Sequence, residues 1–253
     1  MTRAHWVELA GLTALAALLA AALQWVGGQQ GWSWDALNHH VYLGLVAEQP
    51  RWHLDVMPAS YQSYQYPYLY WPVYKLATLG LGAPAAATVW AAVQALALLP
   101  PLWLIALRLL PDTGAVMPPW LERATGCLLG MLSLVILAAL QTTANDLIAA
   151  VPLLWAIAVW MQPGQGLPSA AGGAALLGVS VAFKLSNGLY LPLLLLWWWR
   201  PGTLAEHARR AVVMAAAFSL GLALAYGPWG WQLMQNTGNP FYPYFGAWFA
   251  ESG

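Results

Sequence analysis

The sequence predicts an all-α polytopic membrane protein, in which residues 1–253 form a single transmembrane domain of about seven helices. Hydrophobic residues make up 60% of the chain and charged residues only 7%, whereas a soluble domain carries about 25% charged residues. The mean hydropathy is +0.58. Several long stretches lack charged residues, and most of them approach the roughly 20 residues that a helix needs to cross the hydrocarbon core.

The first three helices are expected over 9–26, 84–107 and 124–145. The stretch 9–26 follows a basic start at Arg3, but it is longer than the apolar region of about 7–15 residues in a cleaved signal peptide. We therefore expect it to remain as a membrane helix. The single cysteine, Cys127, lies in the third stretch, which rules out a disulfide within the chain and makes a cysteine metal site implausible.

The remaining four helices come from three stretches. Residues 147–183 are too many for one span and contain "QPGQGLP" at 162–168, a Gly/Pro turn that predicts a hairpin of two short helices. The stretch 185–199 predicts the sixth helix. The stretch 211–250 contains "YGPWG" at 226–230, so we expect only its first part to span and 230–253 to form an aromatic tail.

The segment 66–82, "YPYLYWPVYKLATLGLG", is apolar and aromatic but contains two prolines and a lysine. If it lies at the interface and the N-terminus is cytoplasmic, six basic residues are inside and three are outside. If it spans, only Arg3 and Lys184 remain inside. The positive-inside rule favours the first arrangement, in which the inner residues are Arg3, Arg108, Arg123, Arg200, Arg209 and Arg210, and the outer ones Arg51, Lys75 and Lys184.

This topology predicts a multi-pass protein of the cell (inner or plasma) membrane, with its active face extracytoplasmic. The outer side receives a long loop, 27–83, containing interfacial helices, and the aromatic tail 230–253. A loop of this length in a compact domain is more often functional than not. The nine basic and nine acidic residues cancel, so the expected partner is the lipid bilayer and not a nucleic acid.

The stretch "WSWDALNHH" follows the first predicted helix and contains the first polar cluster of the outer loop. If it is helical, Asp35, Asn38 and His39 share one face. The alternative is an N-cap, in which Asp35 starts an interfacial helix. Two adjacent histidines without cysteines or an HExxH pattern are a weak indication of zinc.

Asp146 and Lys184 flank the predicted hairpin, so they should return to the same outer level. An ionisable group at the edge of a bilayer often lines a cavity or a substrate path. Asn145 or Asp146 could instead cap the helix from Leu147, and the two charges could simply pair. Lys184, beside a Ser-Asn-Gly junction, could equally hold a phosphate.

The tyrosine-rich segment 59–75, "ASYQSYQYPYLYWPVYK", precedes the second predicted span. Its aromatic residues suit a belt at the bilayer interface. They also suit a wall for a sugar or a polyprenyl chain, because aromatic faces pack on apolar CH surfaces and phenol hydroxyls form directed hydrogen bonds.

The order of these features resembles the membrane-embedded glycosyltransferases of the GT-C superfamily, which take a sugar from a polyprenyl-phosphate carrier on the extracytoplasmic side. An early outer aspartate is followed by "YPYLYW" before the second span and by an acidic residue in "TTANDLIAA". The stretches "FKLSNGLY" and "TGNPFYPYF" also resemble bacterial members. The likeness covers essentially the whole chain, as a short form containing the seven-helix core module; many members continue into further helices and a soluble domain.

The resemblance implies an inverting transfer to a glycan, lipid or protein acceptor, with Asp35 as the catalytic base. It implies that basic residues bind the donor phosphate, with Lys184 preferred over Arg51 and Lys75, because "YPYLYW" lacks the basic residue of some relatives. Asn38, His39 and Asp146 would orient the base or the acceptor. Tyr66, Tyr68 and Trp71 would form the wall for the donor sugar or lipid. Two separated carboxylates leave metal dependence open: a divalent cation is possible, and no metal ligands are assigned.

Two non-catalytic alternatives remain. One is a lipid-linked sugar flippase or small transporter, which would place ionisable residues near the midplane on broken helices, often in two corresponding halves. The sequence shows no internal repeat and its outer charges cluster on one side. The other is an accessory subunit that keeps the fold, for which loss of the early outer acid is expected; Asp35 is present.

Overall fold

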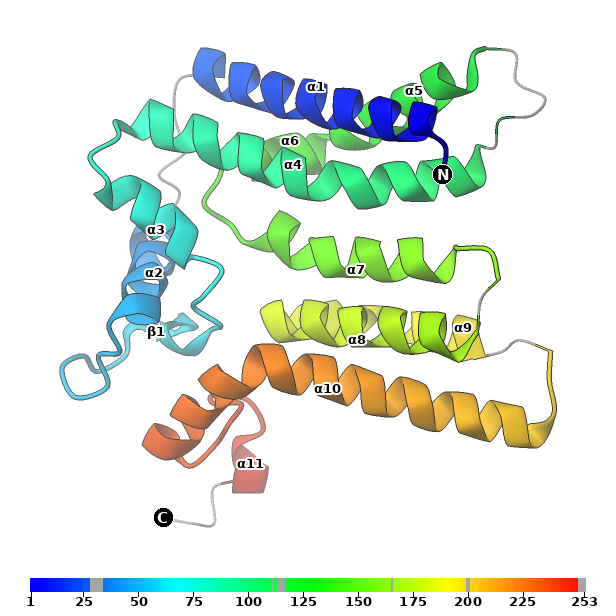
Figure 1. Ribbon diagram of the computed structural model, residues 1–253. Helices are drawn as coiled ribbons and strands as arrows, with labels where there is room; N and C mark the ends of the chain where they lie inside the picture. The colour runs from blue at the N-terminus through cyan, green and yellow to red at the C-terminus, as the bar shows by residue number, and fades with distance from the viewer. Residues whose placement is uncertain (28–33, 111, 113–116, 165, 199–200, 250–253) are drawn as a thin grey trace.

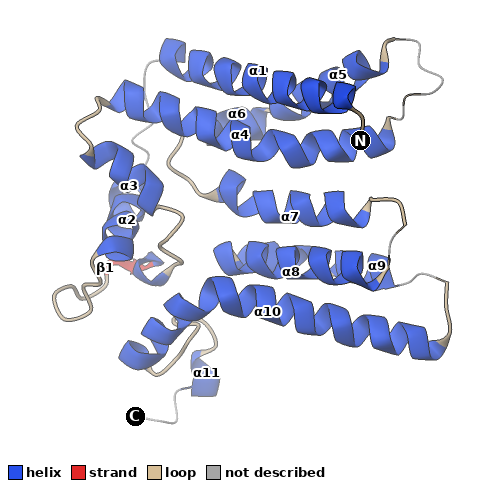
Figure 2. Cartoon of the chain, viewed as in Figure 1, coloured by secondary structure: helices blue, strands red, loops and turns tan. Residues whose placement is uncertain are grey.

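The computed structural model describes residues 1–27, 34–110, 112, 117–164, 166–198 and 201–249. Parts of the predicted outer loop and aromatic tail, and Arg200 among the basic residues, lie outside this set. Nearly all regular structure in the described residues is helical, and β1 (Pro58–Tyr61) is a short strand in the segment between α2 and α3 (Figure 2).

Three helices are long and apolar enough to cross a membrane: α1 (Arg3–Gly27), α4 (Ala83–Leu109) and α10 (Leu204–Thr237). The pair α5 (Pro119–Met131) and α6 (Leu134–Leu140) would add a fourth if it acts as one bent span. Shorter apolar helices are α7 (Asp146–Trp160), α8 (Leu167–Phe183) and Leu185–Leu196, which contains η3 (Leu185–Tyr190) and the start of α9 (Pro192–Trp198). The coarser prediction, an all-α fold with helices fit to span a membrane, is confirmed.

The long helices lie side by side with their axes roughly parallel (Figure 1). Helix α1 packs on α4, α4 on α7, α7 on α8, and α8 on α10. Successive helices of the bundle run in opposite directions, so the chain repeatedly returns to the same end. We call the end that carries α2, α3, β1 and α11 the covered end (left in Figure 1), and the end that carries the N-terminus the N-terminal end.

The covered end is built largely by the segment between α1 and α4. This segment contains η1 (Ala36–His40), α2 (Val41–Glu48), β1, η2 (Gln62–Tyr64) and α3 (Trp71–Thr78). Helix α3 has 8 residues and is therefore about 12 Å long, far short of the roughly 30 Å of a hydrocarbon core. The segment 66–82 therefore contains no helix long enough to span a membrane, as its prolines and lysine indicated.

The single helix expected over 124–145 is not what the structure shows. Helix α5 begins earlier, at Pro119, and ends at Met131; α6 then runs at 66° to it. Ser133 starts α6, because its hydroxyl oxygen accepts a hydrogen bond from the backbone N–H of Ile136 at 3.4 Å. A serine that caps a helix in this way has non-helical backbone angles and begins a new helix. The backbone hydrogen bonds of α5 therefore do not continue into α6.

The break expected at 226–230 is also wrong, because α10 continues through Pro228 to Thr237. A proline removes one helical hydrogen bond, and membrane helices tolerate this where neighbours pack around it. Tyr226 before the proline and Trp229 and Leu233 after it are all buried. Helix α10 starts with a capping box of Thr203 and Glu206. The aromatic tail therefore begins only after Thr237 and includes α11 (Gly246–Phe249).

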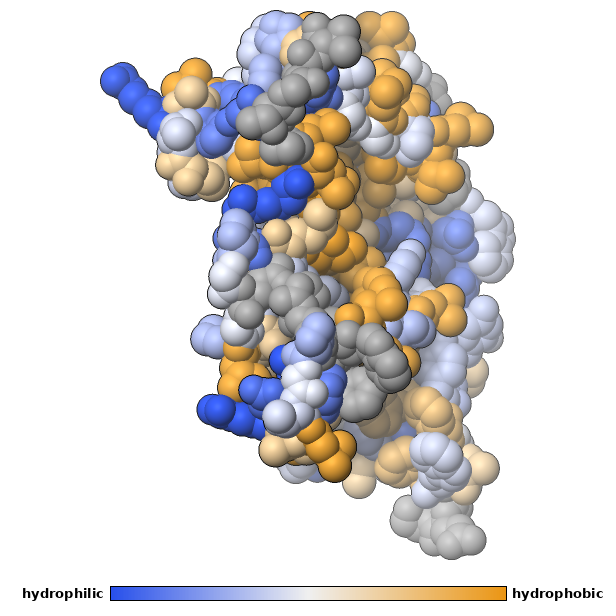
Figure 3. Space-filling view, turned by 90° about the vertical axis from the view of Figure 1, so that its right-hand side faces the viewer, coloured by the Kyte–Doolittle hydropathy of each residue, from blue (hydrophilic) through white to orange (hydrophobic). Residues whose placement is uncertain are grey.

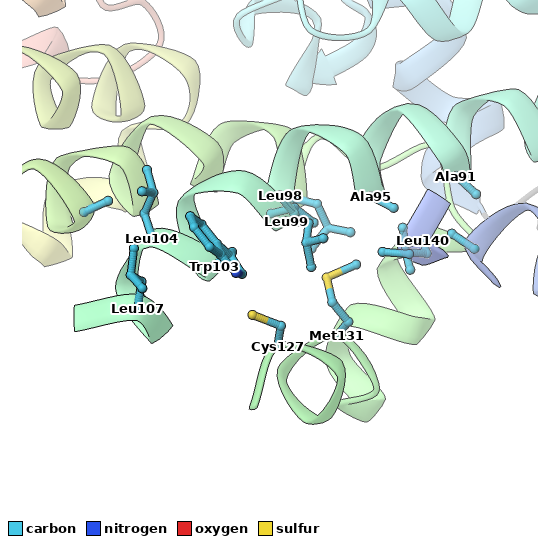
Figure 4. Packing of buried hydrophobic residues seen from close by; sticks show 14 residues of the cluster. Ala91, Ala95, Leu98, Leu99, Trp103, Leu104, Leu107, Cys127, Met131 and Leu140 are labelled. Atoms are coloured by element: carbon cyan, nitrogen blue, oxygen red, sulfur yellow. The ribbon is translucent and has the colours of Figure 1, made fainter. Parts of the chain in front are cut away.

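Close helix packing relies on small and apolar residues. Trp103 and Leu99 of α4 point toward Cys127 and Met131 of α5 in the main core (Figure 4). Helices α8 and α10 approach so closely at Gly178 that an added Cβ would lie 2.2 Å from the carbonyl oxygen of Phe218. Small residues at such crossings allow backbones to pack directly, which is how membrane helices commonly associate.

A buried ionic cluster ties three helices together near the N-terminal end. Arg123 of α5 is 2% exposed and donates hydrogen bonds to Glu8 of α1 at 2.6 and 2.8 Å and to Asp112 at 2.7 Å. Trp103 of α4 donates to Glu8 at 2.7 Å. Viewed onto this end, hydrophilic side chains lie among hydrophobic ones (Figure 3). The sequence marked Arg123 only as an inner charge, and its partners depend on tertiary packing.

We predict that Arg123→Met destabilises the protein by about 3–5 kcal/mol, because it leaves the buried Glu8 carboxylate without its cation. The measurement is thermal unfolding in detergent. Asp112→Asn is the control: its carboxylate is 52% exposed, so its loss should cost about 1 kcal/mol or less. Equal melting temperatures for the two variants would show that the buried pair is not what holds α1 to α5.

Candidate functional site

The covered end contains a cavity of about 340 Å³, here called the central cavity. Four parts of the chain line it: the segment from Asp35 to Tyr70, the start of α7, the junction after α8, and α10 with the tail that follows it. Its ionisable and amide-bearing lining residues are Asp35, His39, His40, Gln62, Gln65, Asn145, Asp146 and Lys184. Its aromatic lining residues are Tyr64, Tyr66, Tyr70, Phe183, Tyr226, Tyr242 and Tyr244.

Asp35 presents a carboxylate that caps no helix. Its backbone is helical, with φ −62° and ψ −40°, and its side chain makes no capping hydrogen bond. The side chain is 55% exposed, and its Oδ1 lies 3.9 Å from Nδ1 of His39, which is longer than a hydrogen bond. The capping alternative is therefore not realised. Asp35 and His39 do share a face: Asp35 directly precedes the π-helical turn η1 and His39 lies within it. Such turns are often found at functional sites.

His39 and His40 are both buried in the cavity wall. His40 is held by a 2.6 Å hydrogen bond between Nδ1 and the hydroxyl of Thr143, and by stacking on Tyr70 with ring centroids 4.6 Å apart. Burial lowers the pKa of His39, and burial together with the neighbouring His39 lowers the pKa of His40 to about 4. Both imidazoles are therefore neutral at neutral pH, since removing a charge from water is costly.

The Nδ1 atom of His39 is buried and has no hydrogen-bond partner among the described residues. Such atoms are rare in folded proteins, because an unpaired buried polar group costs about 1–3 kcal/mol. The atom faces Asp35 across 3.9 Å. A polar ligand group placed between the two side chains would satisfy both.

Asp146 and Lys184 meet at the cavity, as the hairpin predicted. Asp146 is the first residue of α7 and Lys184 follows the last residue of α8. Their side chains form an ion pair, so the pairing alternative is realised. Asp146 is about half exposed and Lys184 about one-third. An ion pair this exposed contributes only about 0–1 kcal/mol, so Lys184 can exchange its partner at little cost.

Hydrogen bonds around Ser180 fix the level at which Lys184 emerges. The hydroxyl of Ser180 is fully buried in α8 and donates to the carbonyl oxygen of Ala149 in α7 at 2.8 Å. The Asn187 amide donates to the same carbonyl at 3.2 Å and to the Ser180 hydroxyl at 2.9 Å. The short helix η3 is thereby joined to both arms of the hairpin.

Of the predicted aromatic wall, only Tyr66 lines the central cavity. Its hydroxyl donates to the carbonyl oxygen of Ala225 at 3.3 Å, and burial raises the pKa of Tyr66 to about 12. Tyr68 lies beside Tyr66, and its hydroxyl accepts a hydrogen bond from Gln232 at 3.1 Å. Asn38 does not line the cavity but donates to Gln62, which does, at 2.7 Å.

The structure does not bring Arg51, Lys75 or Trp71 to the central cavity. Lys75 pairs with Glu48 at 2.6 Å and lies 5.9 Å above the ring of Trp71. Arg51 pairs with Asp55 and lines a second cavity. Of the three predicted phosphate ligands, Lys184 is therefore the one that reaches the central cavity.

Several cavity residues were missed by sequence reasoning. His40 was noted only as the neighbour of His39, and its bond to Thr143 is a long-range contact. Tyr242 and Tyr244 reach the cavity because Asn239 folds the tail back: its amide donates to the carbonyl oxygen of Tyr244 at 2.7 Å, and its Oδ1 accepts from the backbone of Phe241. The stretch "TGNPFYPYF" was the available indication.

The described residues contain no group of three or more His, Cys, Asp or Glu side chains arranged to hold a metal ion. With the histidines neutral, the charges around the cavity are two carboxylates and one ammonium. Among the described residues that line the cavity, Lys184 is the one lysine or arginine, so it is the side chain there that could contact a phosphate.

Comparison with known proteins adds no relative: no protein-family model, no curated protein and no solved structure matches this chain.

We predict that the Asp146–Lys184 pair is not needed for folding. Lys184→Met and Asp146→Asn should each change the free energy of unfolding by about 1 kcal/mol or less, as is usual for exposed ion pairs. Melting temperatures of the two single variants and the double variant provide the test. If both single variants are strongly destabilised and the double variant recovers, the pair is structural and Lys184 has no free role.

Proposed function

We propose that this chain is an integral membrane glycosyltransferase of the GT-C type, which moves a sugar from a polyprenyl-phosphate carrier to an acceptor on the extracytoplasmic face with inversion. The observation that supports this most directly is the composition of the central cavity. Asp35, unpaired His39 and Lys184 come together at one end of the helical bundle among tyrosines. These are the groups that such a transfer needs: a base, a hydrogen-bond donor, a cation and aromatic walls.

The proposed topology has seven spans: α1, α4, the α5–α6 pair, α7, α8, Leu185–Leu196 and α10. The segregation of basic residues supports it. Arg3, Arg108 and Arg123 lie toward the N-terminal end of the bundle, as do Arg209 and Arg210 at the start of α10 (Figure 1). Arg51, Lys75 and Lys184 belong to the covered end. The positive-inside rule then puts the N-terminal end in the cytoplasm and the central cavity outside.

Helices α7 and α8 are short for this arrangement. With 15 and 17 residues, they extend about 22 and 25 Å, less than the roughly 30 Å of an average hydrocarbon core. Such a mismatch is accommodated by local thinning of the bilayer at modest cost. Thinning would bring the headgroup region, where a lipid-linked phosphate resides, toward Asp146 and Lys184.

In the proposed reaction, the acceptor hydroxyl binds between Asp35 and His39. It donates its hydrogen to the Asp35 carboxylate and accepts one from Nδ1–H of the neutral His39. Asp35 removes the proton as the acceptor oxygen attacks the anomeric carbon, and the bond from that carbon to the phosphate oxygen breaks. The polyprenyl phosphate leaves on the opposite face of the sugar, so the configuration inverts. A positioned base of this kind contributes about 10²–10⁴-fold to the rate.

Lys184 would stabilise the leaving phosphate. The donor is a phosphate diester that becomes a monoester, so negative charge grows on its oxygens during the transfer. A fixed positive charge beside that group lowers the barrier because it binds the transition state more tightly than the ground state. Lys184 would exchange its exposed bond with Asp146 for one with the phosphate. Asp146 would then be free to accept a hydrogen bond from a sugar or acceptor hydroxyl.

A lipid-linked sugar flippase or small transporter is the main alternative. Transporters place their ionisable residues on broken helices near the midplane of the membrane, whereas the polar lining described above lies where α7 begins and α8 ends. An accessory subunit with the same fold would keep the cavity without turnover. Activity measurements on purified protein distinguish it from an enzyme.

The central prediction is that Asp35→Asn abolishes most of the activity without loss of stability. The assay is sugar transfer by purified protein, with a panel of radiolabelled polyprenyl-phosphate sugars as donors. Turnover should fall by about 10²-fold or more, the usual effect of losing a general base. The melting temperature should change little, because the Asp35 side chain is exposed and caps no helix.

The matched control is Asp112→Asn, the same substitution at the opposite end of the bundle, which should leave turnover near wild type. Wild-type turnover in Asp35→Asn with an unchanged melting temperature would remove Asp35 from the chemistry. No transfer by the wild-type protein with any donor of the panel would favour the transporter or the accessory subunit.

The topology yields a separate prediction from cysteine labelling. In a Cys127→Ala background, a cysteine at Ser60 should react with a membrane-impermeant thiol reagent in intact cells, and one at Gln162 should react only after permeabilisation. Both positions are exposed in the structure; Thr113, another inner position in this topology, lies outside the described residues. Labelling of position 162 in intact cells would overturn the arrangement.

A further inference from the structure

A second cavity, of about 390 Å³, adjoins the central cavity. We call it the side cavity. Tyr64 lines both, so the two cavities are neighbours. The side cavity is bounded by the loop between α2 and β1 and by the last turns of α10. Its lining includes Tyr42, Arg51, Trp52, His53, Asp55, Met57, Tyr64, Trp229, Gln235, Asn236 and Thr237.

One part of the side cavity is an aromatic surface. Trp52 stacks on Trp229 with ring centroids 5.5 Å apart and an angle of 27° between the planes, and it also stacks on Tyr64 at 6.2 Å. Trp229 is buried and donates a hydrogen bond from Nε1 to the backbone carbonyl of Tyr64 at 3.1 Å. Trp52 remains partly exposed. The Trp52 indole is thus held in place by the buried Trp229, while part of the Trp52 ring stays open to a ligand.

The other part is polar but balanced in charge. Asp55 accepts two hydrogen bonds from the Arg51 guanidinium, and this cation holds the pKa of the Asp55 carboxyl below its usual range. Tyr42 also lines this cavity, and burial together with the nearby Asp55 carboxylate raises the pKa of Tyr42 to about 12. Gln235 and Asn236, near the end of α10, also line the cavity and carry amide groups. A paired arginine and aspartate offer both donors and acceptors without a net charge.

The segment from Met57 to Ser60, beside this cavity, has a strained backbone conformation. Met57 and Ser60 have φ angles of 47° and 55°, in the left-handed region that residues other than glycine rarely adopt. The loop is fixed by a hydrogen bond from the backbone N–H of Ala59 to the buried Ser63 hydroxyl at 2.9 Å. Backbone conformations of this kind are concentrated at binding and catalytic sites, because the surrounding structure must maintain them.

We propose that the side cavity binds a neutral saccharide, which forms the part of a glycan acceptor next to its reacting hydroxyl. Aromatic rings pack on the apolar CH faces of sugars, and paired charged groups and amides bond their hydroxyls. A phosphate in this cavity would face the Asp55 carboxylate, which Arg51 holds in place with two hydrogen bonds, whereas a neutral saccharide can bond both groups. The role as acceptor rests on the proposed function, but saccharide binding itself does not.

The test is saccharide binding to purified protein in lauryldimethylamine oxide or lipid nanodiscs, since a maltoside detergent would occupy the site. The panel is maltohexaose, cellohexaose, mannohexaose and chitotetraose, with inorganic phosphate as the charged competitor. Binding is followed by saturation-transfer difference NMR, because the 17 Trp of the chain obscure a change at one indole. At least one saccharide should bind, and phosphate should not displace it.

Trp52→Ala and Asp55→Asn should each weaken binding about tenfold, which corresponds to about 1.4 kcal/mol. Trp6→Ala is the matched control, an exposed tryptophan near the start of α1, and should bind like wild type. Asp55→Asn and Gln235→Ala leave the aromatic stack intact, so they keep the test valid if Trp52→Ala unfolds. Gln235→Ala should weaken binding by a smaller factor.

Two results would overturn the inference. The first is no binding of any saccharide at about 10 mM, a concentration at which even a weak site with a binding free energy of roughly −4 kcal/mol would be occupied. The second is equal binding by wild type, Trp52→Ala and Asp55→Asn. Asp112→Asn should retain full saccharide binding, since Asp112 lines neither cavity. A protein that binds saccharide through Trp52 yet transfers no sugar would reject the proposed function alone. A protein that transfers sugar with these variants unaffected would reject the side cavity alone.

Discussion

The buried hydrogen bond from Ser180 to the carbonyl oxygen of Ala149 is the interaction on which the arrangement at the covered end depends. It fixes the two arms of the α7–α8 hairpin against one another inside an apolar bundle, where a polar group without a partner would be costly. Asn187 adds two more bonds at the same point. Because the arms are held in this register, the chain returns to the level of Asp146, and the junction after α8 opens toward the histidines of η1.

The chemistry of the central cavity follows from how differently its polar groups are solvated. Asp35 remains in contact with water, whereas His39 and His40 lose their hydration and stay uncharged. A carboxylate next to a protonated imidazole would be tied up in an ion pair. Next to a neutral imidazole with an unused nitrogen, it stays available to a hydroxyl group. Thr143 and Tyr70 contribute indirectly, since they hold His40 and so the wall against which His39 packs.

The sequence predicted the parts of the fold that depend on local composition. Helix α4 matches the stretch 84–107 closely, and "QPGQGLP" correctly marked the turn between α7 and α8. The helix start at Ser133 and the continuation of α10 through Pro228 were not predicted, because both depend on the residues that pack around them.

At the cavity, Asp35, His39, Asp146, Lys184 and Tyr66 were found from their order along the chain. Arg51 could have been set apart, because Asp55 follows it by four residues, a spacing typical of local ion pairs. The partners of Lys75 and His40 are distant in sequence, so these contacts could not be predicted.

The length of α10 has a mechanical consequence. Its 34 residues extend about 50 Å, so a bilayer of ordinary thickness leaves well over a turn outside. Tyr226 lines the central cavity from one side of Pro228, and Gln235 lines the side cavity from the other. A proline in a helix interior is a point of bending. A change in the direction of α10 at Pro228 would therefore move Tyr226 relative to Gln235, and with them one wall of each cavity.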